Sequence, residues 1–206
     1  MAIRTHIITE KDDLPEVVRR YTRGIAQPGD VIALSESMVA ITQGRAVLPQ
    51  SVKVGRFADF LRRFAHPDGS LATPAAMQLA IQEAGLPRVL AAAAAAAIGR
   101  LFGRRGVFFR VADRGLNLID DIGGTLYPYD RTIVLGPVNG QEVARRVKEA
   151  TGVDTLIADV NDIHCVDIIG FTGQEDPREL LEALRNNPQG NDDEQTPIVV
   201  LKRVAS

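Results

Sequence analysis

Apolar and polar residues follow the periods of strands and helices in turn along the whole chain. Short apolar or alternating runs predict strands, and apolar residues spaced three or four apart predict amphipathic helices. The predicted strands span residues 3–9, 31–34, 106–111, 133–135, 155–158, 167–170 and 198–201. The predicted helices span residues 13–25, 52–64, 73–85, 90–98, 139–151 and 176–184. No repeat and no linker interrupts this pattern, so we expect one α+β unit with a mixed β-sheet and packed helices.

Two of these helices carry capping signals at their first residues. Asp13 precedes Pro15 and Glu16, and Asn139 precedes Glu142 by three positions, so each pair fits a capping box. Gly152 follows the second helix, where a glycine commonly ends a helix.

A run of seven alanines, Ala91–Ala97, lies within the predicted helix that includes Leu90 and Ile98. Alanine has the highest helix propensity, and its small side chain lets another helix approach closely. The run therefore predicts a helix buried in a tight core or in a subunit interface. We assign it no chemistry.

Composition describes an ordinary globular protein of 206 residues, 45% hydrophobic and 24% charged. The formal net charge of −2 gives no electrostatic reason to expect a nucleic acid or a membrane as partner. The apolar run from Val89 to Ile98 is half the length that spans a bilayer. The single cysteine, Cys165, excludes an internal disulfide, and the N-terminus lacks a signal sequence, so we expect a cytoplasmic protein.

The end of the strand at 155–158 carries the most informative polar cluster. Asp159 and Asn161 follow the apolar run, share a face in an extended chain, and are followed by Asp162. Ligands of α/β proteins tend to bind beyond the carboxyl ends of such strands, and hard oxygen ligands suit Mg²⁺ or Mn²⁺ with a phosphate. The alternative is a turn in which these residues cap backbone groups.

A second acidic cluster follows the apolar stretch 115–119. Asp120 and Asp121 precede Gly123 and Gly124, whose missing side chains permit close approach of the backbone to a ligand. Paired carboxylates favour a cation between them. A solvated turn is the competing interpretation.

Ser35-Glu36-Ser37 follows the strand at 31–34, where hydroxyl and backbone N–H groups are able to hold phosphate. The N-cap of the next helix is the interpretation that we favour for this segment. The chain has no P-loop, no dinucleotide-binding glycine motif and no nucleophile elbow, so nucleotide binding requires another architecture. Cys165 is expected to be a small core residue.

Three segments together resemble the gamma-glutamyl ligases that extend coenzyme F420-0 with glutamate. Gly29-Asp30 leading a strand and Gly44-Arg45 closing the segment resemble the opening motif of that family. Leu156-Ile-Ala-Asp159 is similar to the strand that ends in a metal-binding aspartate, and Asp167-Ile-Ile-Gly170 to the strand after it. Asp120 or Asp121 matches the position of an earlier metal aspartate in the family.

The resemblance implies a gamma-glutamyl ligase-like fold without a P-loop, a single ligase-like domain over residues 1–206, and a homodimer. It implies GTP, with ATP as the other candidate, and Mn²⁺ or Mg²⁺ as cofactors, and a small-molecule carboxylate acceptor that is activated as an acyl phosphate. Asp159 and one of Asp120 and Asp121 would hold the metal, with Asn161 and Asp162 as further ligands. The implied phosphate contacts are Ser35, Ser37, Gly123 and Gly124.

The chain departs from the family pattern at several positions. Ser37 and Ile41 stand where the family has lysines, and Val160 replaces the threonine after the metal aspartate. The absence of the two lysines removes positive charge, which makes a non-catalytic ligand-binding or structural descendant the alternative to an active ligase. A metal-dependent phosphohydrolase is a third hypothesis, since the same carboxylates would serve it.

Overall fold

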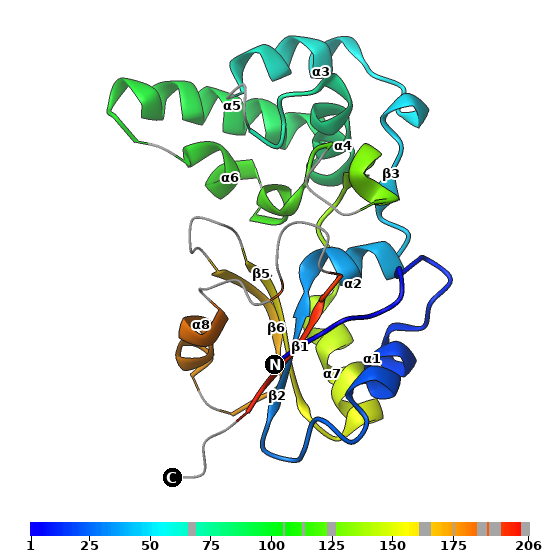
Figure 1. Ribbon diagram of the computed structural model, residues 1–206. Coiled ribbons are helices and arrows are strands. Elements are labelled where there is room, and N and C mark those ends of the chain that lie inside the picture. Colours follow the sequence, from blue (N-terminus) through cyan, green and yellow to red (C-terminus); the bar gives the residue numbers. More distant parts are fainter. Residues whose placement is uncertain are drawn as a thin grey trace. The chain divides into compact units, whose positions relative to one another are not determined.

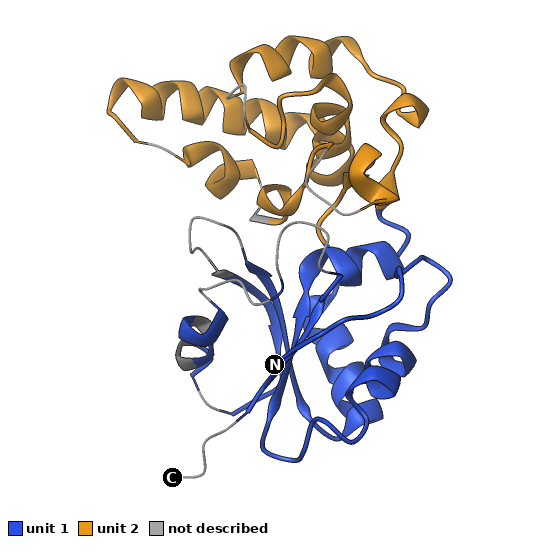
Figure 2. Cartoon of the chain, viewed as in Figure 1, with its two compact units in different colours: residues 1–45, 137–206 blue, residues 46–136 orange. Residues whose placement is uncertain are grey.

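The protein is described here from a computed structural model, which folds into two compact units (Figure 2). Unit 1 comprises residues 1–45 and 137–206, and unit 2 comprises residues 46–136. The sequence predicts a single domain over residues 1–206. The division into two units does not test this prediction, because a compact unit need not be a domain that folds independently. The structure describes residues 1–65, 69–104, 106–112, 114–122, 127–160, 166–174, 176–184, 189 and 195–202.

Unit 1 is built on a five-stranded sheet with the strand order β1-β7-β2-β5-β6. β2 and β5 are parallel, and the other neighbouring strands are antiparallel, which confirms the predicted mixed sheet of an α+β protein. The strands are β1 (Ala2–Ile3), β2 (Val31–Ser35), β5 (Asp154–Val160), β6 (Val166–Phe171) and β7 (Ile198–Leu201). The helices are α1 (Leu14–Thr22), α2 (Glu36–Thr42), α7 (Gly140–Thr151) and α8 (Arg178–Leu184).

Helices cover both faces of this sheet, with α8 on one face and α1 and α7 on the other (Figure 1). The alternation of side chains along β2 explains the arrangement, because Ala33 packs with Leu184 of α8 while its neighbours Ile32 and Leu34 point to the opposite face. All of these side chains are fully buried. A strand buried on both faces reads as a continuous apolar run, which is why residues 31–34 were recognisable from sequence.

The two capping predictions have different outcomes. At α1 the Asp13 carboxylate accepts a hydrogen bond from the Glu16 backbone N–H at 3.0 Å, which confirms the predicted N-cap. At α7 the predicted capping box is wrong. Asn139 is left-handed, with φ 53°, and its side chain makes no capping bond, while the Glu142 carboxylate accepts from Arg145 instead. Gly152, with φ 73°, ends the helix as predicted.

The first predicted strand is mostly wrong, since pairing with β7 stops at Ile3 although the alternating pattern continues to Thr9. Beyond β1 one more backbone bond follows, from the Thr5 N–H to the Gln195 carbonyl at 3.0 Å, and the chain then makes side-chain bonds instead. The Tyr21 hydroxyl accepts from the His6 backbone N–H at 3.0 Å, and the Asp12 carboxylate accepts from the Thr9 N–H at 2.8 Å. These bonds satisfy backbone groups that a sheet ladder would otherwise pair.

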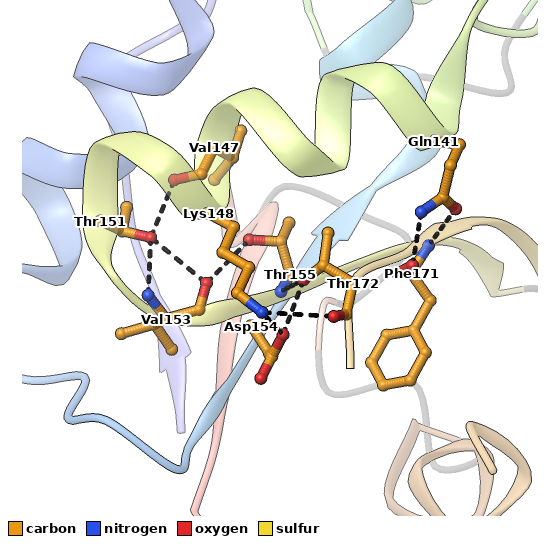
Figure 3. A network of polar contacts seen from close by, with 9 residues as sticks. All are labelled: Gln141, Val147, Lys148, Thr151, Val153, Asp154, Thr155, Phe171 and Thr172. Carbon is orange, nitrogen blue, oxygen red and sulfur yellow. Dashed lines mark hydrogen bonds and ion pairs between the residues drawn. The ribbon is translucent and has the colours of Figure 1, made fainter. Parts of the chain in front are cut away.

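A polar network holds the first residue of β5 between α7 and the end of β6 (Figure 3). The Lys148 ammonium donates to the Asp154 carboxylate at 2.7 Å, and the Thr172 hydroxyl donates to the same oxygen at 2.9 Å. The Thr155 N–H in turn donates to the Thr172 hydroxyl at 2.9 Å. The network anchors the start of the strand whose opposite end carries Asp159.

Unit 2 is mainly helical and has its own apolar core, with a small antiparallel pair formed by β3 (Ala46–Val47) and β4 (Ile133–Val134). The α-helices are α3 (Arg56–Leu61), α4 (Pro74–Ala84), α5 (Leu86–Leu101) and α6 (Val107–Ala112). The 3₁₀ helices are η1 (Pro49–Ser51), η2 (Arg62–Phe64), η3 (Arg114–Leu118) and η4 (Tyr129–Arg131).

The strand predicted at residues 106–111 is wrong, because this segment forms α6. Its β-branched and aromatic residues favour a strand locally. Packing overrides that preference: α6 lies so close to α5 that a Cβ added at Gly99 would stand 2.7 Å from a methyl group of Val107. Phe108 and Phe109 pack against the unit 2 core.

The other two helical predictions of this region are partly right. The helix predicted over residues 52–64 begins only at Arg56 and tightens into η2. The alanine run lies in α5 as predicted, but only one face of the helix is buried: Ala92 belongs to the unit 2 core, whereas Ile98 is 58% and Leu101 84% exposed. A role in a subunit interface stays a prediction.

No single helix among the described residues is both long enough and apolar enough to cross a bilayer. α4 and α5 meet that criterion only as a pair, and the pair is bent by 114°.

Candidate functional site

Ser35 links the end of β2 to the start of α2. Its hydroxyl accepts a hydrogen bond from the Met38 backbone N–H at 3.4 Å and lies 2.7 Å from the Ser37 hydroxyl. The structure therefore brings these two predicted residues together and shows the N-cap that the sequence favoured. Contact of either hydroxyl with phosphate stays a prediction.

Asp159 lies near the carboxyl end of β5, next to Ser35. The register pairs Ser35 with Ala158 in the parallel ladder, and it pairs Asp159 with Asp167 in the antiparallel ladder to β6. Polar side chains therefore meet at one end of the sheet, where β2 and β5 end and β6 begins. We call this end the sheet edge. Because successive residues of a strand alternate between faces, the two aspartates lie on one face and Ser35 lies on the other.

The electrostatics of this edge disfavour a charged Asp159 in the absence of a cation. Burial of the half-buried carboxyl group raises the pKa of Asp159, and the negative charge of Asp167 raises it further. Asp167 is exposed. A divalent cation at this pair would reverse both effects, because it would replace lost hydration and neutralise the repulsion between the carboxylates.

The pair is compatible with Mg²⁺ or Mn²⁺, which proteins often hold through one or two carboxylates together with water and substrate phosphates. Within the described ranges, no group of three or more His, Cys, Asp or Glu side chains is arranged to hold a metal. Bound phosphate and water would therefore have to complete the coordination. Asn161 and Asp162, the two further predicted ligands, lie outside the described residues.

The other predicted acids belong to unit 2. Asp120 forms an isolated bridge with Val134, in which each backbone N–H donates to the other's carbonyl at 2.8 and 2.9 Å. The Asp121 carboxylate accepts from the Thr73 hydroxyl at 3.2 Å and from the Ile122 N–H at 2.8 Å. The backbone bridge fixes the direction of this segment, and Asp121 is tied to the residue that caps α4. Gly123 and Gly124 lie outside the described residues.

Sequence reasoning missed two acids of the unit 1 edge. Asp167 was placed in a strand by its apolar neighbours, but its pairing with Asp159 depends on a register shift at Ile157 and Ala158 that the sequence does not reveal. Glu36 is 5% exposed, although it sits between two serines in a segment that looks like a polar turn. The Glu36 side chain is buried by tertiary packing around the start of α2, which the sequence alone does not show.

A shallow pocket of about 150 Å³ lies elsewhere in unit 1, between the start of α1, the end of α2 and α7. It contains none of the predicted site residues. Its lining combines acidic, apolar and basic side chains, from Asp12, Asp13, Leu14, Pro15, Thr42, Gln43, Val143 and Arg146.

Comparison with known proteins adds one positive finding. The sequence model of the F420-0:gamma-glutamyl ligase family matches residues 2–158. The match includes Ser35, Ser37, Asp120 and Asp121 and ends one residue before Asp159. A search of curated proteins finds no match to the chain.

Proposed function

Because the chain belongs to the F420-0:gamma-glutamyl ligase family, we propose that it joins an amino acid to a small-molecule carboxylate through an amide bond. The match over residues 2–158 is the observation that carries this proposal. The substrate carboxylate takes the terminal phosphoryl group of GTP, or of ATP, and becomes an acyl phosphate. The amino group of glutamate then attacks the acyl carbon, so that the amide forms and phosphate leaves.

We assign the divalent metal to the edge of the unit 1 sheet, where Asp159 and Asp167 form a carboxylate pair. When bound, Mn²⁺ or Mg²⁺ supplies positive charge to phosphate oxygens during phosphoryl transfer. The raised pKa of Asp159 is consistent with the assignment, because it reflects a carboxylate that is partly removed from water and lies opposite the charge of Asp167. Asp120 and Asp121 are metal ligands that the family resemblance alone proposes, and so are Asn161 and Asp162.

For the nucleotide, we propose that the Ser35 and Ser37 hydroxyl groups donate hydrogen bonds to phosphate. The two hydroxyl oxygens lie 2.7 Å apart, which is close enough for both groups to bind the same phosphate. Both hydroxyl groups are half-buried, so each of these bonds would be partly shielded from water. Gly123 and Gly124 are proposed backbone contacts by the resemblance.

A non-catalytic descendant of the family is the second candidate, and one observation favours it. Ile41, which stands where the family has a lysine, is 8% exposed and belongs to the apolar core. Ser37, at the position of the other lysine, bonds Ser35. Neither position supplies the positive charge that would offset a triphosphate. Ligand binding without turnover is the behaviour expected of such a descendant.

Phosphate release from GTP separates these candidates. We expect release to require Mn²⁺, F420-0 and glutamate together, with a glutamylated product detected by mass spectrometry. Nucleotide binding without release in any mixture would favour the non-catalytic descendant. Release that requires neither F420-0 nor glutamate would favour a phosphohydrolase.

Substitution at the sheet edge tests the site assignment. Asp159→Asn preserves shape and removes a charge, so we expect product formation to fall at least a hundredfold. Glu10→Gln, which neutralises an exposed acid of the same unit, is the matched control and should leave the rate unchanged. Equal rates for the two variants would contradict the assignment of the metal to Asp159.

A further inference from the structure

The two units carry opposite net charges, which the small net charge of the whole chain conceals. Residues 46–136 contain eleven lysine and arginine against seven aspartate and glutamate residues, a formal charge of +4. The rest of the chain contains 13 against 19, a formal charge of −6. A formal charge of +4 would favour contact of unit 2 with anionic surfaces, although the chain as a whole is acidic.

Unit 2 also exposes a continuous apolar helix face. Exposed apolar residues of α5 recur every three or four positions between Leu90 and Leu101, about three turns, while the exposed Arg88 and Arg100 of the same helix lie outside this row. Three of them are large, with Leu90 at 40%, Ile98 at 58% and Leu101 at 84% exposure, and Phe102 after the helix is 76% exposed. The face consists of Leu90, Ala91, Ala94, Ala97, Ile98 and Leu101.

A second exposed apolar row, of three phenylalanines, lies on α3 and η2. Phe57, Phe60 and Phe64 are each 54% exposed and are spaced three and four residues apart. The rings of Phe60 and Phe64 meet edge to face, with centroids 5.2 Å apart. The Arg100 guanidinium donates to the Phe64 carbonyl at 2.7 Å, which joins this row to the end of α5.

Basic side chains flank both apolar rows. Residues 53–65 and 98–104 contain six lysine and arginine residues against one acid, Asp59, which pairs with both Arg62 and Arg63. The exposed bases are Lys53, Arg56, Arg63, Arg100 and Arg104. We call the two apolar rows, Phe102 and these bases the α3–α5 surface.

We propose that the α3–α5 surface binds the face of an anionic lipid membrane. Helices that lie in the membrane interface combine exposed Phe and Leu with flanking Lys and Arg, so that apolar groups enter the acyl boundary while cations meet lipid phosphates. α5 has 16 residues and is shorter than the roughly 20 that span a bilayer, so it lies along the surface. A second copy of the chain fits less well, because a two-fold contact would bring like-charged arginines together.

Sedimentation of the full chain with vesicles tests this proposal. We expect binding to vesicles of phosphatidylcholine and phosphatidylglycerol, weak binding to phosphatidylcholine alone, and a loss of binding as salt is raised. The double variant Leu101→Ser/Phe102→Ser should lower the partition coefficient at least tenfold. Its melting temperature should stay near that of the wild type, because both side chains are largely exposed.

The matched control is Ile7→Ser/Val138→Ser, which removes two exposed apolar side chains from unit 1, at 41% and 44% exposure. This control should bind vesicles as the wild type does. Failure of the wild type to sediment with the anionic vesicles would overturn the proposal, and so would equal binding by the two double variants. A solution dimer that only Leu101→Ser/Phe102→Ser dissociates, without vesicle binding, would assign the surface to a second copy.

Discussion

Asp159 of β5 stands opposite Asp167 of β6 in an antiparallel pair, so two carboxylates meet at one cross-strand position. Like charges placed directly opposite destabilise a sheet. Two carboxylates paired near the carboxyl end of β5 are therefore expected to lower the stability of the fold, and a bound cation would offset this loss. The pair therefore links the stability of the fold to the proposed metal site.

The first prediction concerns the pH dependence of stability. Burial and the charge of Asp167 raise the pKa of Asp159 in the folded protein above its unfolded value. The folded state then binds this proton more tightly, so without metal the contribution of Asp159 to stability falls as pH rises from the unfolded pKa through the folded pKa. Asp159→Asn removes the titrating group and should be more stable than the wild type above that window.

Urea unfolding of both proteins across the acidic to neutral range measures the difference. The free energy of unfolding of Asp159→Asn should exceed that of the wild type by an amount that grows with pH and then levels off. Asp130→Asn, at a carboxyl group 41% exposed, serves as the control and should show no such growth. A difference that stays constant with pH would contradict the assigned cause.

The second prediction concerns the contact of α7 with β6. A Cβ at Gly170 would stand 2.5 Å from the Gly140 carbonyl oxygen, which is backbone and has little freedom to move. Gly170→Ala should therefore destabilise the protein by about 1–3 kcal/mol or more. Gly152→Ala meets open space but adopts φ 73°, so about 1–2 kcal/mol is expected from backbone strain alone.

Gly→Asn replacements separate these two causes, because asparagine tolerates the left-handed region. Gly152→Asn should recover part of the stability that Gly152→Ala loses, whereas Gly170→Asn should be no better than Gly170→Ala. Thermal unfolding measures all four variants. If Gly170→Asn were more stable than Gly170→Ala, steric overlap with the Gly140 carbonyl would not be the cause of the destabilisation.

The third prediction concerns the network of Figure 3, in which Lys148 and Thr172 donate to one oxygen of Asp154. Lys148→Met and Thr172→Val should each cost about 1 kcal/mol, because each removes one partner of a half-buried carboxylate. The double variant should deviate from additivity by about 0.5 kcal/mol or more, since both bonds share an acceptor. A double-mutant cycle in urea checks this, and strict additivity would contradict a coupled network.

The fourth prediction concerns the two positions where the family has lysines. Ile41 is 8% exposed in the core, so Ile41→Lys should cost roughly 3 kcal/mol by burying an unpaired charge. Ser37 is half-buried, and Ser37→Lys should cost less than half as much. Melting temperatures compare the two variants. A tolerated lysine at position 41 would show that this helix is able to turn the side chain to water.

Local signals in the sequence were sufficient for much of unit 1. Asp13 and Pro15 located the start of α1, and the apolar run 31–34 located β2. These features depend on residues close in sequence. The strand predicted at residues 106–111 failed because its helix is stabilised by contact with α5, which no local pattern shows.

The candidate site was predictable only in part for the same reason. Asp159 was found because it follows a buried apolar run within β5. Asp167 was missed as its partner because the pairing depends on a bulge in the ladder. The expectation of no membrane partner rested on the net charge of −2, which averages over two units of opposite sign and is not tested by the structure.

The most direct test of the proposed function is a thermal-shift titration of the wild-type protein with GTP, with and without Mn²⁺. A ligand that binds only the folded state adds about 2.7 kcal/mol at 100 times its Kd, which raises the melting temperature. We predict a rise that requires GTP and Mn²⁺ together and that is lost in Asp159→Asn. An unchanged melting temperature with every combination, at concentrations up to millimolar, would contradict a nucleotide- and metal-dependent ligase.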